Sequence, residues 1–124
     1  MSNRLAQFAG EKYLSIESYR KTGEPVRTPV WFVENNDVLY VRTSEDTGKY
    51  KRVRNNPVVK IAPCYSLGKP KGDWIKAEAR LASEQDAQNA YRLLEKKYGI
   101  IYRMTSIFLR RRELAILEIR VTDN

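Results

Sequence analysis

The sequence predicts a mainly β domain in which about six antiparallel strands form a small closed or nearly closed barrel, with two or three helices. The first observation behind this prediction is that apolar and polar residues alternate with strand period through most of the chain. The second is that short turns join most of these segments, and short connections produce antiparallel pairs. The third is size, because 124 residues with 42% hydrophobic content suit a single domain over 1–124 with a real core.

The N-terminal half is predicted to contain one helix and three strands. The helix is expected over residues 3–11. Its apolar residues Leu5, Phe8 and Ala9 fall on one face. The strands that follow are bounded by turn residues such as those of ENND. We expect the strands at 13–19, 26–33 and 38–43, with turns at 21–24 and 34–37.

The C-terminal half is predicted to contain two helices and three strands. A short basic helix over 48–56 places Tyr50 and Val53 inward, and Pro57 ends it. A longer helix begins at Ser83, which opens a capping-box pattern, and runs to about Tyr98, after which Gly99 is a typical stop. Strands are expected at 58–65, 74–82 and 113–121, with a polar loop at 66–73 and an ambiguous apolar segment at 100–109.

The composition excludes several kinds of chemistry. The single cysteine, Cys64, permits neither an intrachain disulfide nor a thiolate zinc cluster, and it is expected to be a small buried residue. The absence of histidine removes histidine-based triads, and we predict no metal site. No apolar run approaches the ~20 residues that span a bilayer, and residues 1–12 do not resemble a secretory signal, so a cytoplasmic location without membrane partners is expected.

The segment PVRTPVWFV, residues 25–33, departs from simple alternation. Positions 29–33 are all apolar, which predicts that both faces of this strand are covered. The second cover is either a partner subunit, a bound ring system or the helices of the same chain. Pro25 and Pro29 interrupt strand pairing, which leaves neighbouring backbone groups able to face a ligand. Arg27 is then either a solvated edge charge or an anion contact.

The segment TSEDTGKYKRVRNNP, residues 43–57, concentrates positive charge in a chain whose formal net charge is +8. It can be a solvated helix face, a nucleic-acid surface supported by the eight tyrosines of the chain, or a specific phosphate site. Thr43 and Ser44 supply hydroxyls, and Gly48 allows close backbone approach. Lys49 adds a charge to the first turn of a helix, whose N-terminus favours anions. This order of residues favours the phosphate site.

Four segments also carry a resemblance to a known family: VRTPVWF at 26–32, LYVRT at 39–43, GKYKRVRNNPVVKIAPC at 48–64 and AEARL at 77–81. By their order and spacing the chain resembles the split-barrel flavin and deazaflavin oxidoreductases related to pyridoxamine 5′-phosphate oxidase. It is most similar to the small coenzyme F420-dependent members. The likeness extends over nearly the whole chain, from about Tyr13 to Val121.

The resemblance implies a six-stranded split barrel that forms a homodimer with two cofactor sites at the interface. It implies that Arg27 and Lys49 contact the cofactor phosphate, and that the backbone of residues 28–31 lies against the ring system. Thr43 matches a hydroxyl at the end of the third strand, and Arg52 is a further anion contact. Together with the basic segment, this gives the expected cofactor-binding residues Arg27, Thr28, Pro29, Val30, Trp31, Thr43, Ser44, Gly48, Lys49 and Arg52.

Two departures from the oxidases themselves argue against vitamin B6 oxidation. The true oxidases have an arginine where this chain has Gly48, and they hold substrate with a segment that contains histidine, which this chain lacks. The expected function is therefore F420-dependent hydride transfer to or from a small organic substrate, with FMN as the alternative cofactor. An acidic cofactor tail would follow a basic track formed by Lys51, Arg52, Arg54, Lys69 and Lys71.

The cofactor carries the hydride chemistry in such a protein, so no side chain is predicted to be catalytic. Tyr50, Tyr65 and Tyr102 are candidate proton donors, although core packing explains each equally well. The rival hypothesis from another class is a non-catalytic nucleic-acid-binding barrel, which would bind oligonucleotides with a steep salt dependence.

Overall fold

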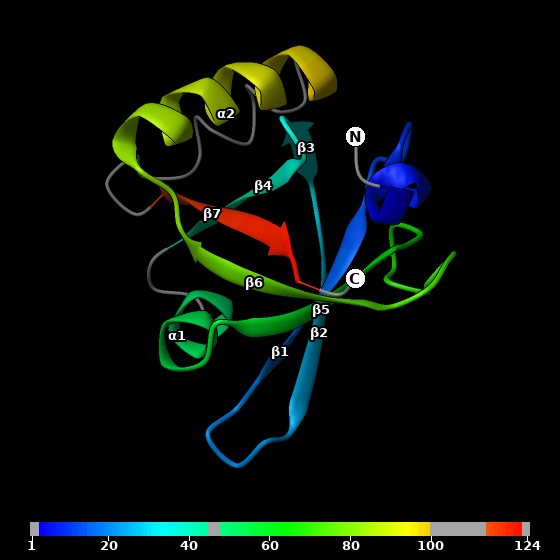
Figure 1. Cartoon of the computed structure of the whole chain (residues 1–124), viewed down its shortest axis with the longest axis vertical. Coiled ribbons are helices and arrows are strands. Elements are labelled where there is room, and N and C mark those ends of the chain that lie inside the picture. Colours follow the sequence, from blue (N-terminus) through cyan, green and yellow to red (C-terminus); the bar gives the residue numbers. More distant parts are fainter. Residues whose placement is uncertain (1–2, 45–47, 100–113, 123–124) are drawn as a thin grey trace.

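The computed structural model describes residues 3–44, 48–99 and 114–122, and within them one curled antiparallel sheet holds seven strands in the order β2-β1-β5-β6-β7-β4-β3. The prediction of a mainly β fold with helices is confirmed (Figure 1). The elements are η1 (Asn3–Phe8), β1 (Leu14–Tyr19), β2 (Pro25–Val30), β3 (Phe32–Asn35), β4 (Val38–Ser44), α1 (Gly48–Asn55), β5 (Val58–Pro63), β6 (Ile75–Leu81), α2 (Glu84–Tyr98) and β7 (Leu114–Val121).

The strand predicted over 26–33 is in fact two strands, which raises the strand count from six to seven. Val30 pairs with Leu14 of β1, whereas Phe32 pairs with Val41 of β4. Because β2 and β3 lie at opposite edges of the sheet, the chain crosses from one edge to the other at Trp31. Curling of the sheet therefore imposes a break that local alternation does not reveal.

Several local predictions hold in detail. The ENND turn carries the two positive-φ residues Asn36 and Asp37, at 53° and 65°, as a tight hairpin turn between β3 and β4 requires. The Ser83 side chain caps α2 by accepting a hydrogen bond from the Asp86 N–H at 3.2 Å. Gly99 ends the same helix with a φ of 67°. The predicted N-terminal helix is a 3-10 helix, and the ambiguous segment 100–109 lies outside the described residues.

Side chains from the two faces of the sheet form two apolar clusters. The inner face packs as the barrel core, in which Ile16, Leu39 and Ile61 are fully buried. On the outer face, α2 lies across β3, β4 and β7 and buries Leu94 against them (Figure 1). The helix α1 packs instead at an end of the sheet against β1, β4 and β6.

In the part of the chain that the structure describes, no helix combines the length and the apolar character needed to cross a bilayer. The predicted cytoplasmic location stays a prediction.

Candidate functional site

Lys49 lies in the first turn of α1, and its amino group is affected by the charges of two arginines. Burial lowers the pKa of Lys49 to about 8, with smaller contributions from the charges of Arg52 and Arg42. Among the described residues, none forms a hydrogen bond or an ion pair with this amino group. A half-buried lysine that is repelled by two arginines is a position where a bound anion would relieve both repulsion and desolvation.

Arg52, one turn further along α1, is held over the beginning of the helix. Its Nε donates a hydrogen bond to the Ser18 hydroxyl at 2.7 Å. Its guanidinium also lies 2.7 Å from the point where a Cβ at position 48 would stand. A side chain at Gly48 would therefore displace Arg52. At the glycine expected to admit a ligand, the space beside the backbone is thus occupied by the end of the Arg52 side chain.

Arg42, near the end of β4, connects this cation cluster to the break between β2 and β3. Its guanidinium carbon lies 5.8 Å from the centre of the Trp31 ring, and its charge reaches Lys49. Trp31 in turn stacks on Tyr98 of α2, with the ring centres 4.5 Å apart and the planes 8° from parallel. Arg42 is thus near the tryptophan of the predicted ring-binding segment, and its charge also acts on the predicted phosphate lysine.

The backbone next to this tryptophan is fixed by the end of α2. The Phe32 N–H donates to the Tyr98 hydroxyl at 3.0 Å, and the Phe32 carbonyl accepts from the Lys97 amino group at 2.8 Å. The Tyr98 hydroxyl donates to the Phe32 carbonyl at 2.9 Å or to the Lys12 carbonyl at 2.8 Å. Burial raises the pKa of Tyr98 to about 12, so this hydroxyl keeps its proton. The helix, rather than a ligand, satisfies these backbone groups.

The same helix supplies the second cover that the apolar run 29–33 predicts. Val33 is buried against α2 on the outer face of the sheet, while Val30 and Phe32 belong to the barrel core. Thr28 is half-buried and Pro29 exposed on the edge strand β2, as expected for a proline in a sheet.

Arg27 is not part of the cation cluster. Its Nε donates to the Glu17 carboxylate at 2.8 Å, and its guanidinium lies 4.6 Å from the centre of the Trp74 ring. Glu17 and Ser18 are consecutive in β1, so their side chains point to opposite faces of the sheet. Arg27 on Glu17 and Arg52 on Ser18 therefore lie on opposite sides of this strand.

The two hydroxyl residues predicted for the phosphate site end β4. Thr43 is buried and pairs with Ala115 of β7, and Ser44 is the last residue of the strand. The next described residue is Gly48, which begins α1. Both hydroxyl residues thus stand on the strand that leads toward the cation cluster.

The predicted basic track is not continuous. Lys51 and Arg54 are exposed on α1, but Lys69 and Lys71 belong to the loop that follows β5. Because α1 precedes β5 and this loop follows it, the two groups lie at opposite ends of that strand (Figure 1). Lys71 also forms an ion pair with Glu11 at 2.8 Å.

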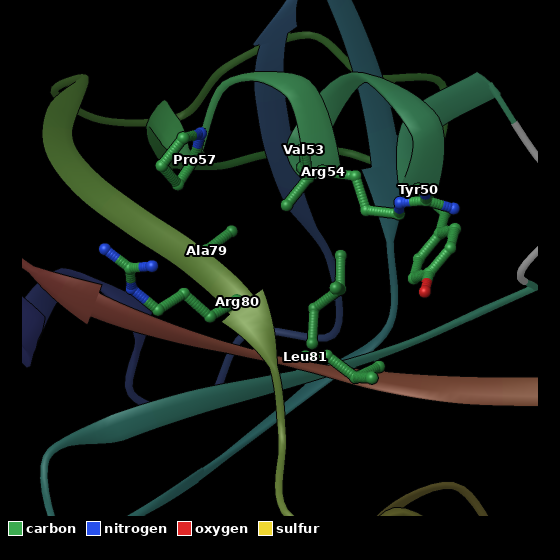
Figure 2. A pocket seen from close by; sticks show the side chains of 8 residues that line it. Tyr50, Val53, Arg54, Pro57, Ala79, Arg80 and Leu81 are labelled. Atoms are coloured by element: carbon green, nitrogen blue, oxygen red, sulfur yellow. The ribbon is translucent and has the colours of Figure 1, made fainter.

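A pocket of about 250 Å³ lies on another side of α1, between this helix and strands β6 and β7 (Figure 2). Pro57 and Leu117 are apolar residues of its lining. The remaining lining comes from Tyr50, Val53 and Arg54 of α1 and from Ala79, Arg80 and Leu81 of β6.

The candidate proton donors are dispersed. Tyr50 lines this pocket, Tyr65 is exposed beneath the Lys71 amino group, and Tyr102 lies outside the described residues. Cys64 is buried, as predicted, and burial raises the pKa of its thiol. Within the described segments, no group of three potential metal ligands comes together.

The comparisons with known proteins agree with the fold. The family described as pyridoxamine 5′-phosphate oxidase matches residues 2–123. The chain belongs to this family. Its curled seven-stranded sheet is accordingly the split barrel that the sequence predicts. A search of the curated proteins finds no significant match.

Solved structures similar to this family member share its fold at low sequence identity. A protein from Listeria innocua, described as a candidate pyridoxamine 5′-phosphate oxidase, is 17% identical with a TM-score of 0.68, over 97% of this chain and 91% of that one. HutZ, the heme storage protein from Vibrio cholerae, is 17% identical with a TM-score of 0.74, over 93% and 84%. A protein described as an F420 reductase is 16% identical with a TM-score of 0.65, over 98% and 95%.

Two residues of this family member's site were not predicted as site residues. Arg42 directly precedes Thr43 but carries no pattern of its own that separates it from other strand arginines. Ser18 did carry a signal, because it falls on the same face of β1 as the buried Leu14 and Ile16. A hydroxyl on an otherwise apolar face indicates a polar partner, which here is Arg52.

Proposed function

We propose that this protein is an oxidoreductase that binds coenzyme F420 and transfers a hydride between it and a small organic substrate. The observation that carries the proposal is the Lys49 amino group, which is partly desolvated and repelled by Arg52 and Arg42. No described carboxylate pairs with this amino group. Such a donor set fits the phosphate of an isoalloxazine-type cofactor.

Lys49 and Arg52 would hold the phosphate at the beginning of α1, where the helix dipole also favours an anion. Thr43 and Ser44 end β4, the strand that comes before this helix. The ring system would lie toward Trp31, which Arg42 links to the cation cluster. When bound, the cofactor supplies the hydride chemistry, while the protein binds and orients it.

The positive charge of the chain favours F420 over FMN. The net charge of +8 and the exposed Lys51 on α1 suit an acidic tail better than a single phosphate does. A homodimer with the cofactor at its interface is part of the proposal.

Titration of the purified protein with F420 and with FMN at one fixed salt concentration tests the proposal. Replacing Lys49 by alanine should weaken binding of the preferred cofactor at least about tenfold, since a charge-assisted hydrogen bond contributes roughly 1.5–3 kcal/mol. Lys96→Ala is the matched control, because Lys96 is an exposed lysine in the last turn of α2, outside the cation cluster. It should bind the cofactor as the wild type does.

The outcomes are distinct. Tighter binding of FMN would replace F420 by the alternative cofactor and keep the site. If Lys49→Ala bound the cofactor as tightly as the wild type, the assignment of Lys49 as the phosphate-binding residue would be refuted. If the protein bound neither cofactor but bound oligonucleotides in a salt-dependent way, the proposed oxidoreductase function would be refuted. A nucleic-acid-binding barrel would then be the better explanation.

A further inference from the structure

We propose that the pocket between α1 and strands β6 and β7 binds a small apolar molecule that carries one carboxylate. The pocket lies where α1 packs at an end of the curled sheet, and barrel mouths are preferred positions for small-molecule sites. Its volume of about 250 Å³ is below that of typical drug-sized sites, which indicates a ligand of the size of a single substituted ring.

The apolar residues of the pocket lining indicate that most of the ligand is apolar. Val53 of α1, Ala79 of β6 and Leu117 of β7 are buried residues of the barrel core that also line this pocket. Leu81 extends the apolar wall to the surface, where its side chain is 55% exposed. An apolar ligand would remove this leucine from water, which is a favourable exchange.

The charge of the ligand is determined by Arg54. Arg80, the other arginine of the pocket, already pairs with the Glu78 carboxylate at 2.9 Å. Arg54 instead lies 5.8 Å over the ring of Tyr50, and none of the described carboxylates pairs with it. Figure 2 shows Arg54 and Tyr50 together at one end of the pocket, with the Arg80 head group at the other. The carboxylate therefore belongs at the Tyr50 end.

This pocket is separate from the proposed cofactor phosphate site. Tyr50 and Arg54 are four residues apart on α1 and share one side of the helix. Lys49 and Arg52 are three residues apart and share another. The proposed carboxylate site and the proposed cofactor site can therefore be tested separately, although residues of α1 contribute to both.

Titration of ¹⁵N-labelled protein with benzoate and with benzyl alcohol tests the proposal. Benzoate should bind saturably and shift the backbone signals of Val53, Ala79 and Leu117. Benzyl alcohol, which has the same ring without the charge, should bind at the same place about three- to fivefold more weakly, the scale of an exposed charge pair. Benzoate shifts that gather around Lys49 and Arg42 instead would overturn the proposal.

Two variants test the contribution of the Arg54 charge and that of the apolar lining separately. Arg54→Gln should lower benzoate affinity about three- to fivefold and leave benzyl alcohol unchanged, whereas Leu81→Ser should weaken both ligands. Lys51→Gln is the matched control, because it removes the same charge from an exposed position of α1 outside the pocket lining. Equal loss of benzoate affinity in Arg54→Gln and Lys51→Gln would show a nonspecific charge effect and refute the site.

Discussion

Replacing Tyr98 by phenylalanine should destabilise the protein by about 2 kcal/mol, the scale of a buried donor that loses its acceptor. The variant keeps the ring that stacks on Trp31 and removes the hydroxyl that accepts from the Phe32 N–H at 3.0 Å. The Phe32 carbonyl keeps the Lys97 amino group as a donor at 2.8 Å. The Lys12 carbonyl is near the surface, where water replaces the lost donor. The cost therefore arises mainly at one backbone N–H.

Equilibrium unfolding in urea at neutral pH and one fixed protein concentration measures this loss. Tyr65→Phe is the control, because Tyr65 is 54% exposed and its hydroxyl has no described hydrogen-bond partner, so its unfolding free energy should change by less than about 0.5 kcal/mol. If Tyr98→Phe were as stable as this control, the claim that α2 secures the break between β2 and β3 would be refuted.

Two predictions concern pH. Burial alone would raise the pKa of Glu17, but hydrogen bonds from Tyr19 and Arg27 and the charges of Arg27 and Lys60 hold it below its usual value of 4.5. Glu17→Gln should therefore cost about 1 kcal/mol at neutral pH, and this difference should shrink as the pH falls below about 4.5; a constant difference in acid urea titrations would contradict this. The depressed pKa of Lys49, about 8 against 10.5, means that the unfolded chain binds more protons between these values. The unfolding free energy of the free protein should therefore rise with pH across that range, and Lys49→Met should lack the part of the rise that Lys49 contributes. If the unfolding free energies of the wild type and of Lys49→Met changed in parallel with pH, Lys49 would not be desolvated in the folded protein.

The sequence predicts most elements of the fold because alternation and capping are local properties. The strand at 13–19 and the helix that begins after Ser83 lie within a residue or two of their predicted bounds. The break at Trp31 escapes prediction because every residue of 29–33 is apolar, so the pattern does not change where the strand changes partner. Only closure of the sheet in three dimensions places that break.

The residues of the candidate site likewise fall into those placed by local spacing and those placed by strand pairing. Lys49, Gly48 and Arg52 come together as expected, because one helical turn determines their spacing. Arg27 does not join them, because its position depends on the register of β2 against β1, which places it opposite Glu17. The link through Arg42 depends on β3 and β4 being neighbours. Residues brought together by strand pairing are thus the part that sequence reasoning leaves open.

The prolines of β2 also have a consequence for how two molecules can associate. Positions 25, 27 and 29 direct their backbone groups to one side of this edge strand, and two of the three lack an N–H. A neighbouring chain that approached this edge would find few donors for a shared ladder of hydrogen bonds. The β2 edge is therefore poorly suited to extending the sheet with a further strand.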